Sequence, residues 1–174
     1  TGELHFFGYS PLPPFLTYHV LDATGALVHS AEIDVPKGTM MHDFMITRDH
    51  AIFMDLPVVF DLSNLQAPLK WDDNYGARVG ILPRKGTNAD IRWFEVDPCY
   101  VFHPLNAYVD GDKVVCDVGR HASMWRGSME QGDPLRAARA ISSSSIRMMQ
   151  RRLEAPVNSS SSASSSIRLY AAFS

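Results

Sequence analysis

Residues 44–56 of this 174-residue chain read Phe44-Met45-Ile46-Thr47-Arg48-Asp49-His50-Ala51-Ile52-Phe53-Met54-Asp55-Leu56. Two apolar runs flank the polar pair Arg48-Asp49, which is typical of two antiparallel strands joined by a tight turn. The second run is almost continuously apolar, as expected for a strand buried on both faces. This stretch therefore predicts a β-structured core with the second strand inside it.

Short strands and tight turns continue in both directions along the chain. Further strands are predicted at residues 3–8, 15–21, 26–34, 77–83, 91–96, 100–108 and 113–118, whereas residues 63–76 are polar and predict a strandless connection. The last two strands are joined through Asp110-Gly111-Asp112, whose Asp-Gly pair tolerates positive φ. No convincing helix interrupts the series. The pattern predicts an all-β sandwich, barrel or propeller.

The sequence changes in character near Arg126. Serine tracts follow at residues 142–145, 159–162 and 164–166, without a steady apolar period between them. Such tracts bury too little apolar surface to offset the loss of chain entropy on folding. We therefore predict a partial β-domain over residues 1–125 and a low-complexity Ser/Arg-rich tail over residues 126–174 that is disordered or weakly helical.

Composition limits the classes of function. The chain is 45% apolar and 20% charged, as in globular proteins, and its net charge of −3 gives no reason to expect a nucleic-acid partner. Cys99 and Cys116 stand far apart, which excludes a cysteine zinc site and favours a reduced, cytoplasmic setting. No apolar run is long enough for a transmembrane helix. A start at Thr1 without a signal peptide fits a processed product or an internal fragment.

Two of the seven histidines are candidates for metal ligands. The sequence lacks HExxH, P-loop, GxGxxG and GxSxG motifs, and it has no HxD or HxE triplet. His42 lies between apolar pairs, and His103 precedes Pro104, which restricts His103 to an extended backbone. Burying an imidazole is costly unless both nitrogens have partners, which a metal and a carbonyl or carboxylate can provide. An exposed or hydrogen-bonded imidazole is the structural alternative for each, and Asp43 is expected to point away from His42.

Seven motifs occur in an order that closely resembles the middle of the carotenoid oxygenases, the family of carotenoid cleavage and lignostilbene dioxygenases. The resemblance covers roughly residues 3–121. The motifs are Phe7-Gly8-Tyr9-Ser10, Pro13-Pro14-Phe15-Leu16-Thr17-Tyr18, Met40-Met41-His42-Asp43-Phe44, Ile52-Phe53-Met54-Asp55-Leu56-Pro57, Gly80-Ile81-Leu82-Pro83-Arg84, Arg92-Trp93-Phe94 and Phe102-His103-Pro104-Leu105-Asn106-Ala107-Tyr108.

The resemblance implies a seven-bladed β-propeller, of which this chain would hold two to three blades. It implies a non-haem Fe(II) on the propeller axis, held by four histidines. His42 and His103 match two of them, and the other two lie outside the matched segment. The implied partners are O2 and an apolar polyene or stilbene, whose conjugated double bond is cleaved to two carbonyl products, and the full-length enzyme would make peripheral contact with a membrane. Phe102 is expected nearest the substrate tunnel, although packing in the core is the simpler expectation.

The chain departs from the family pattern in three places. Met45 stands where alanine is usual, and Val109 stands where glutamate commonly follows Asn-Ala-Tyr. Beyond His121 the pattern nearly vanishes, and only residues 168–173 faintly resemble a later family segment. A shifted reading frame between the two matching parts is one explanation of the Ser/Arg-rich sequence. Two rival functions are a non-catalytic truncated β-domain acting in protein association and a plain zinc-binding β-module. The isolated chain is expected to hold no iron tightly and to be inactive.

Overall fold

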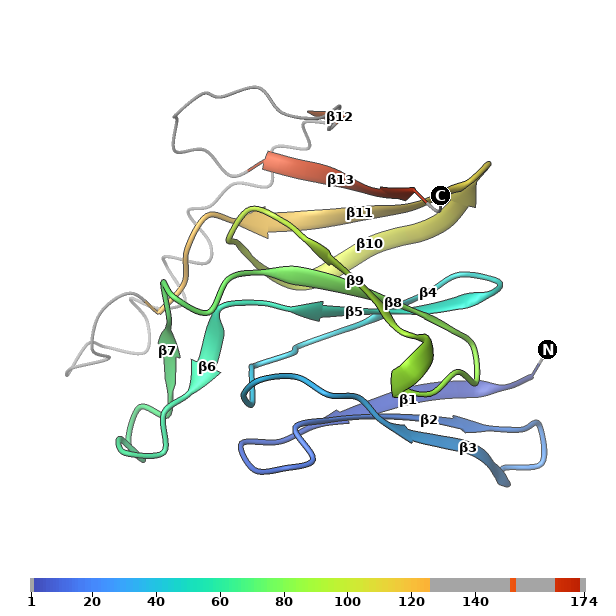
Figure 1. Cartoon of the computed structure of the whole chain (residues 1–174), viewed down its shortest axis with the longest axis horizontal. Coiled ribbons are helices and arrows are strands. Elements are labelled where there is room, and N and C mark those ends of the chain that lie inside the picture. The colour runs from blue at the N-terminus through green and yellow to red at the C-terminus, as the bar shows by residue number, and fades with distance from the viewer. Residues whose placement is uncertain (1, 126–150, 153–164, 173–174) are drawn as a thin grey trace.

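A computed structural model describes residues 2–125, 151–152 and 165–172 of the chain (Figure 1). It confirms the all-β class, since the helical content of this described part is a single 3-10 turn, η1 (Asn88–Asp90). The strands are β1 (Leu4–Tyr9), β2 (Leu16–Leu21), β3 (Leu27–Glu32), β4 (Met45–Ile46), β5 (His50–Asp55), β6 (Val58–Phe60), β7 (Leu69–Trp71), β8 (Arg78–Pro83), β9 (Arg92–Glu95), β10 (Tyr100–Asp110), β11 (Lys113–His121), β12 (Arg151–Arg152) and β13 (Ser165–Ala172).

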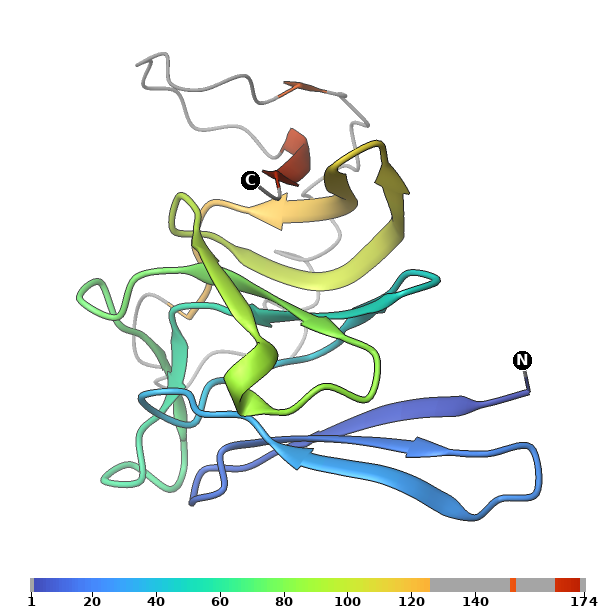
Figure 2. The same ribbon diagram turned by 45° about the vertical axis from the view of Figure 1, so that its right-hand side comes forward.

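The strands form three sheets and a separate β6–β7 hairpin. The sheet orders are β1-β2-β3, β4-β5-β8-β9 and β10-β11-β13-β12. Figures 1 and 2 show the β4-β5-β8-β9 sheet between the other two, with the β6–β7 hairpin at one end. Such an arrangement leaves the middle sheet with both faces covered by protein.

Strand β5 shows why its sequence is almost continuously apolar. Successive side chains of a strand point to opposite faces of its sheet. Ala51 and Phe53 belong to the core between the middle sheet and β1-β2-β3, whereas Ile52 and Met54 belong to the core on the side of β10 and β11. All four are buried. The predicted antiparallel pair around Arg48-Asp49 and the burial of its second strand on both faces are confirmed.

Gly80 in β8 marks a place where the sheet has no room for a side chain. A Cβ atom there would lie 2.7 Å from both Ile91 Cδ1 and Trp93 Cζ3, and the Trp93 ring also carries the Arg78 guanidinium 4.1 Å from its centre. We expect Gly80→Ala to lower the free energy of unfolding by about 1–3 kcal/mol, because overpacking forces the neighbours to shift. Urea unfolding followed by circular dichroism measures the change.

Gly119 in β11 is the matched control for this substitution. Among the described atoms, a Cβ atom at Gly119 would have no neighbour closer than 4.0 Å, so Gly119→Ala is expected to leave stability unchanged or to raise it. Equal losses of stability in the two variants would contradict the steric explanation.

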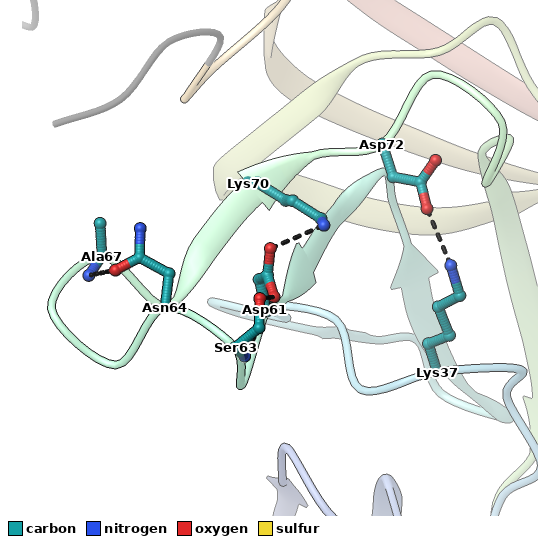
Figure 3. Close-up of polar contacts among 7 residues, drawn as sticks. All are labelled: Lys37, Asp61, Ser63, Asn64, Ala67, Lys70 and Asp72. Atoms are coloured by element: carbon teal, nitrogen blue, oxygen red, sulfur yellow. Dashed lines mark hydrogen bonds and ion pairs between the residues drawn. The ribbon is translucent and has the colours of Figure 1, made fainter.

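The β6–β7 hairpin corrects the prediction that residues 63–76 contain no strand. Leu69–Trp71 pairs antiparallel with Val58–Phe60. Figure 3 shows two ion pairs beside the hairpin, from Lys70 Nζ to Asp61 Oδ2 at 2.7 Å and from Lys37 Nζ to Asp72 Oδ2 at 2.8 Å. Lys70 and Ser63 beside Asp61 lower the pKa of that carboxyl to about 2. A strand of three residues is too short for its alternation to be recognised within polar sequence.

The predicted tail differs from expectation in the two segments that the structure describes. The backbone of Ser165–Ala172 is strand β13, paired antiparallel with β11 from Lys113 to Arg120, and Arg151–Arg152 pairs parallel with it. An open strand edge presents unpaired N–H and C=O groups that favour the addition of another strand, which local serine content does not reveal. The rest of the predicted tail lies outside the described residues, and the boundary at residue 125 stays a prediction. No helix in the described part is long and apolar enough to cross a membrane.

Candidate metal centre

The structure brings His42 and His103 together although 60 residues separate them in the sequence. His42 lies on the irregular segment before β4, and His103 lies on β10. Their ring centroids are 4.8 Å apart, and the ring planes are nearly perpendicular at 87°. The two rings are therefore close enough to be ligands of one ion, as two ligands of a shared metal site must be.

An irregularity in β10 aims two neighbouring side chains at His42. Adjacent residues of a regular strand point to opposite faces, yet both Phe102 and His103 lie against the His42 ring, with centroids at 5.5 and 4.8 Å. The register between β10 and β11 shifts between Val101 and Pro104 and again before Asn106. Bulges of this kind re-aim side chains beside functional sites. Pro104, which has no N–H to donate, sits at this irregularity.

The segment that carries His42 is fixed from both sides. Met41 is buried in the core beside β1-β2-β3, and Met45 is buried in the core beside β10 and β11. The Met40 N–H donates to the Val58 carbonyl at 2.8 Å, and the Tyr100 hydroxyl donates to the Met40 carbonyl at 3.2 Å. His42 is therefore held between two methionines that pack in the cores.

Asp55 forms a buried polar network beneath this segment. Its Oδ1 accepts hydrogen bonds from the Tyr75 hydroxyl at 2.9 Å and the Thr39 hydroxyl at 3.3 Å, and its Oδ2 accepts from Arg78 Nε at 2.8 Å. Burial raises the pKa of Asp55, while the bonds from Arg78 and Tyr75 oppose that rise. The network links Thr39, three residues before His42, to the middle sheet. Sequence alone does not predict it, because the pairing of Asp55 with Arg78 depends on the register of β5 and β8.

The expected burial of the two histidines is wrong. Both His42 and His103 are exposed in the described part of the chain. The core packing of this segment comes from Met41 and Met45, and no described segment covers the two rings. The physical reason is that the apolar neighbours in sequence turn into the two cores and leave the imidazoles on an open face.

Hydrogen bonding nevertheless separates this pair from four other histidines. His5, His19, His29 and His50 each bond a neighbouring oxygen, from Tyr18, Ser30, Gly86 and Thr47. The described residues give no such partner to His42 or His103, so both rings keep nitrogens free for a ligand. Two neutral imidazoles at this separation fit as neighbouring ligands of a divalent metal. The described residues contain no group of three or more His, Cys, Asp or Glu side chains suited to a metal.

Phe102 lies at the centre of a ring cluster that the sequence did not predict. Tyr100, His121 and Trp125 surround it at centroid separations of 4.8, 5.5 and 5.7 Å. Phe102 is half-buried, and it packs against the core beside β10. The i, i+2 spacing of Tyr100 and Phe102 is the signal that could have placed them on one face. A role for Phe102 in substrate binding stays a prediction.

Three acidic residues have structural roles, and the turn that holds two of them was predicted. Asp43 accepts a hydrogen bond from the backbone N–H of Phe44 at 2.8 Å. Asp110 and Asp112 flank Gly111, whose φ of +59° forms the turn between β10 and β11. Asp43 therefore caps its own segment, and the other two belong to the turn.

The family model described as Retinal pigment epithelial membrane protein matches residues 1–170. The carotenoid 9,10(9',10')-cleavage dioxygenase of Crocus sativus is 40% identical over 120 residues, which cover 66% of this chain and 22% of that relative. Among solved structures, lignostilbene dioxygenase of Pseudomonas brassicacearum superposes with a TM-score of 0.62 and 28% identity over 69% of this chain and 26% of that one. The cobalt-substituted apocarotenoid oxygenase of Synechocystis gives a TM-score of 0.56 and 25% identity over 68% and 26%. The chain thus spans only about a quarter of the proteins that it matches.

Proposed function

Because the chain belongs to the retinal pigment epithelial membrane protein family of carotenoid oxygenases, we propose that it is part of a non-haem Fe(II) dioxygenase. The proposed reaction cleaves a conjugated carbon–carbon double bond of a carotenoid, apocarotenoid or stilbene with O2 and gives two carbonyl products. The observation that carries the proposal is the convergence of His42 and His103, whose rings meet 4.8 Å apart.

His42 and His103 are the residues of this chain that would hold the metal. Iron(II) with neutral imidazole ligands supplies open positions at which O2 is activated. Within residues 2–125 neither ring has a hydrogen-bond partner, and the bulge in β10 and the anchored Met40 backbone hold the two rings side by side. The remaining ligands would come from parts of the enzyme beyond this chain, which accounts for the exposure of the pair.

The three sheets correspond to successive blades of a β-propeller in this proposal. Their antiparallel strands, their face-to-face packing and the superposition on a lignostilbene dioxygenase support it. The match of the family model up to residue 170 supports a further point, namely that β13 belongs to the same β-domain as β11. The Ser/Arg-rich sequence between them lies within the matched range, and the shifted reading frame stays a hypothesis that sequencing of the coding DNA tests.

Phe102 would meet the apolar substrate. A half-buried aromatic ring in contact with His42 offers apolar surface directly beside the proposed metal. The cytoplasm is the proposed location, since the buried Cys99 and Cys116 are free thiols. Peripheral membrane contact of the full-length enzyme remains a proposal from the resemblance.

The isolated chain is expected to hold no stoichiometric iron and to cleave no polyene, because two exposed imidazoles make an incomplete ligand set. Elemental analysis of the chain after exposure to Fe(II), together with an assay on a carotenoid and a stilbene, measures both properties. One iron per chain with product formation would contradict this expectation.

A non-catalytic role in protein association is the second candidate. It is favoured by exposed apolar side chains on the β1-β2-β3 sheet, among them Leu4, Phe6 and Leu27. Apolar patches of this kind mark interaction surfaces or aggregation sites. Size-exclusion chromatography together with a Co(II) titration separates the two candidates. A stable oligomer that binds no Co(II) favours protein association. A monomer that binds Co(II) through its histidines favours the enzyme fragment.

A further inference from the structure

Tyr100 connects the two segments that carry the candidate ligands. It lies on β10 three residues before His103, and its side chain is fully buried. Its hydroxyl donates a hydrogen bond to the carbonyl of Met40, two residues before His42, at 3.2 Å. A single side chain therefore joins the strand of one histidine to the backbone of the other.

The segment that follows Met40 depends on few such bonds. Residues 41–44 lie outside the strands, and β4 is only two residues long. The Tyr100 ring also lies edge-on to Phe102 at 4.8 Å, and Phe102 contacts His42 at 5.5 Å. A phenylalanine at position 100 would fill the same space, whereas the buried Tyr100 hydroxyl requires a hydrogen-bond partner.

We propose that Tyr100 is a positioning residue of the metal centre, whose hydroxyl fixes the backbone before His42 against the strand of His103. That Tyr100 serves a metal centre rests on the proposed function. That its hydroxyl fixes the backbone before His42 can be tested in the metal-free chain. Tyr100 touches neither metal nor substrate in this proposal. It acts through the Met40 carbonyl and through the Phe102 ring.

The metal-free chain gives the first test. Tyr100→Phe removes only the hydroxyl, and we expect amide hydrogen exchange in residues 41–44 to become about three- to tenfold faster, as the loss of one hydrogen bond allows. Tyr18→Phe is the matched control, because it removes another buried hydroxyl, which bonds His5 Nδ1 at 2.7 Å, and keeps the Tyr18 ring that packs in one core with Met41 and Phe44. The control is expected to leave exchange in residues 41–44 unchanged.

Metal binding gives the second test. Co(II) is titrated into the full chain while the imidazole resonances of His42 and His103 are followed by NMR. Tyr100→Phe is expected to weaken Co(II) binding by about three- to tenfold, and Tyr18→Phe is expected to leave it unchanged. Neither readout requires an active enzyme.

The outcomes distinguish the two proposals. Failure of the unmodified chain to bind Co(II) through both histidines would overturn the metal site, whereas unchanged amide exchange in Tyr100→Phe would overturn the positioning role whatever the metal does. Equal effects of Tyr100→Phe and Tyr18→Phe would also overturn it. If Tyr100→Phe does not fold, the unmodified chain serves instead. A slowly exchanging Tyr100 hydroxyl proton close to the Met41 amide supports the role, and its absence contradicts it.

Discussion

Asp55→Ala is expected to lower the free energy of unfolding by about 3–5 kcal/mol, the range observed when one partner of a buried ion pair is removed. Asp55 is fully buried, and its carboxylate accepts hydrogen bonds from Arg78, Tyr75 and Thr39. Removing it leaves the Thr39 and Tyr75 hydroxyls and the partly exposed Arg78 guanidinium without their acceptor. Urea unfolding monitored by tryptophan fluorescence and circular dichroism measures the loss.

Asp49 provides the matched control, because it forms an ion pair of similar length on the surface. Arg48 Nη2 lies 2.9 Å from Asp49 Oδ2, and these side chains are 90% and 50% exposed. Water and salt screen such a pair, so Asp49→Ala should not change stability measurably. Asp55→Asn should fall between the two, since its amide oxygen still accepts one or more of the bonds. Equal stability of the Asp55→Ala and Asp49→Ala variants would contradict a structural role for the network.

The sequence predicted most strands because their patterns are local. The apolar run of β5 required burial on both faces, and the Asp-Gly pair required a turn between β10 and β11. The β6–β7 hairpin was not predicted, because a strand of three residues such as Leu69–Trp71 is too short to show the alternation of apolar and polar residues. Strand β13 was not predicted because it forms by pairing with the edge of β11, and its own serine-rich sequence shows no strand pattern.

The candidate site could also be predicted from the sequence only in part. Composition made His42 and His103 unusual, and the family resemblance paired them, but neither could reveal that a bulge turns Phe102 and His103 toward the same ring. Asp55 and Arg78 face each other only through the register of β5 and β8, and Tyr100 meets Met40 only when the sheets pack. The burial of the histidines was predicted wrongly because apolar neighbours in sequence were taken for neighbours in space.

His103→Ala is expected to weaken Co(II) binding to the chain by at least about tenfold. Loss of a residue that only hydrogen-bonds a metal ligand already weakens metal binding by about tenfold or more, and loss of a ligand should cost at least as much. The two rings stand 4.8 Å apart, so an ion that uses both loses its second protein ligand in this variant. His42→Ala should have the same effect, and the double variant should be little worse than either single one, because the pair acts as a unit. Paramagnetic broadening of histidine resonances during a Co(II) titration measures the affinity at each site.

His19→Ala is the control, since His19 lies on β2 and bonds the Ser30 hydroxyl at 2.9 Å. It should leave Co(II) binding unchanged. His121→Ala tests whether the ring that contacts Phe102 at 5.5 Å joins the pair, and unchanged affinity is expected, because the described residues form no three-ligand group. Additive losses in His42→Ala and His103→Ala would mean that each ring binds its own ion. That result would separate the two histidines into independent surface sites, and the metal centre proposed for this chain would then have no basis in its own residues.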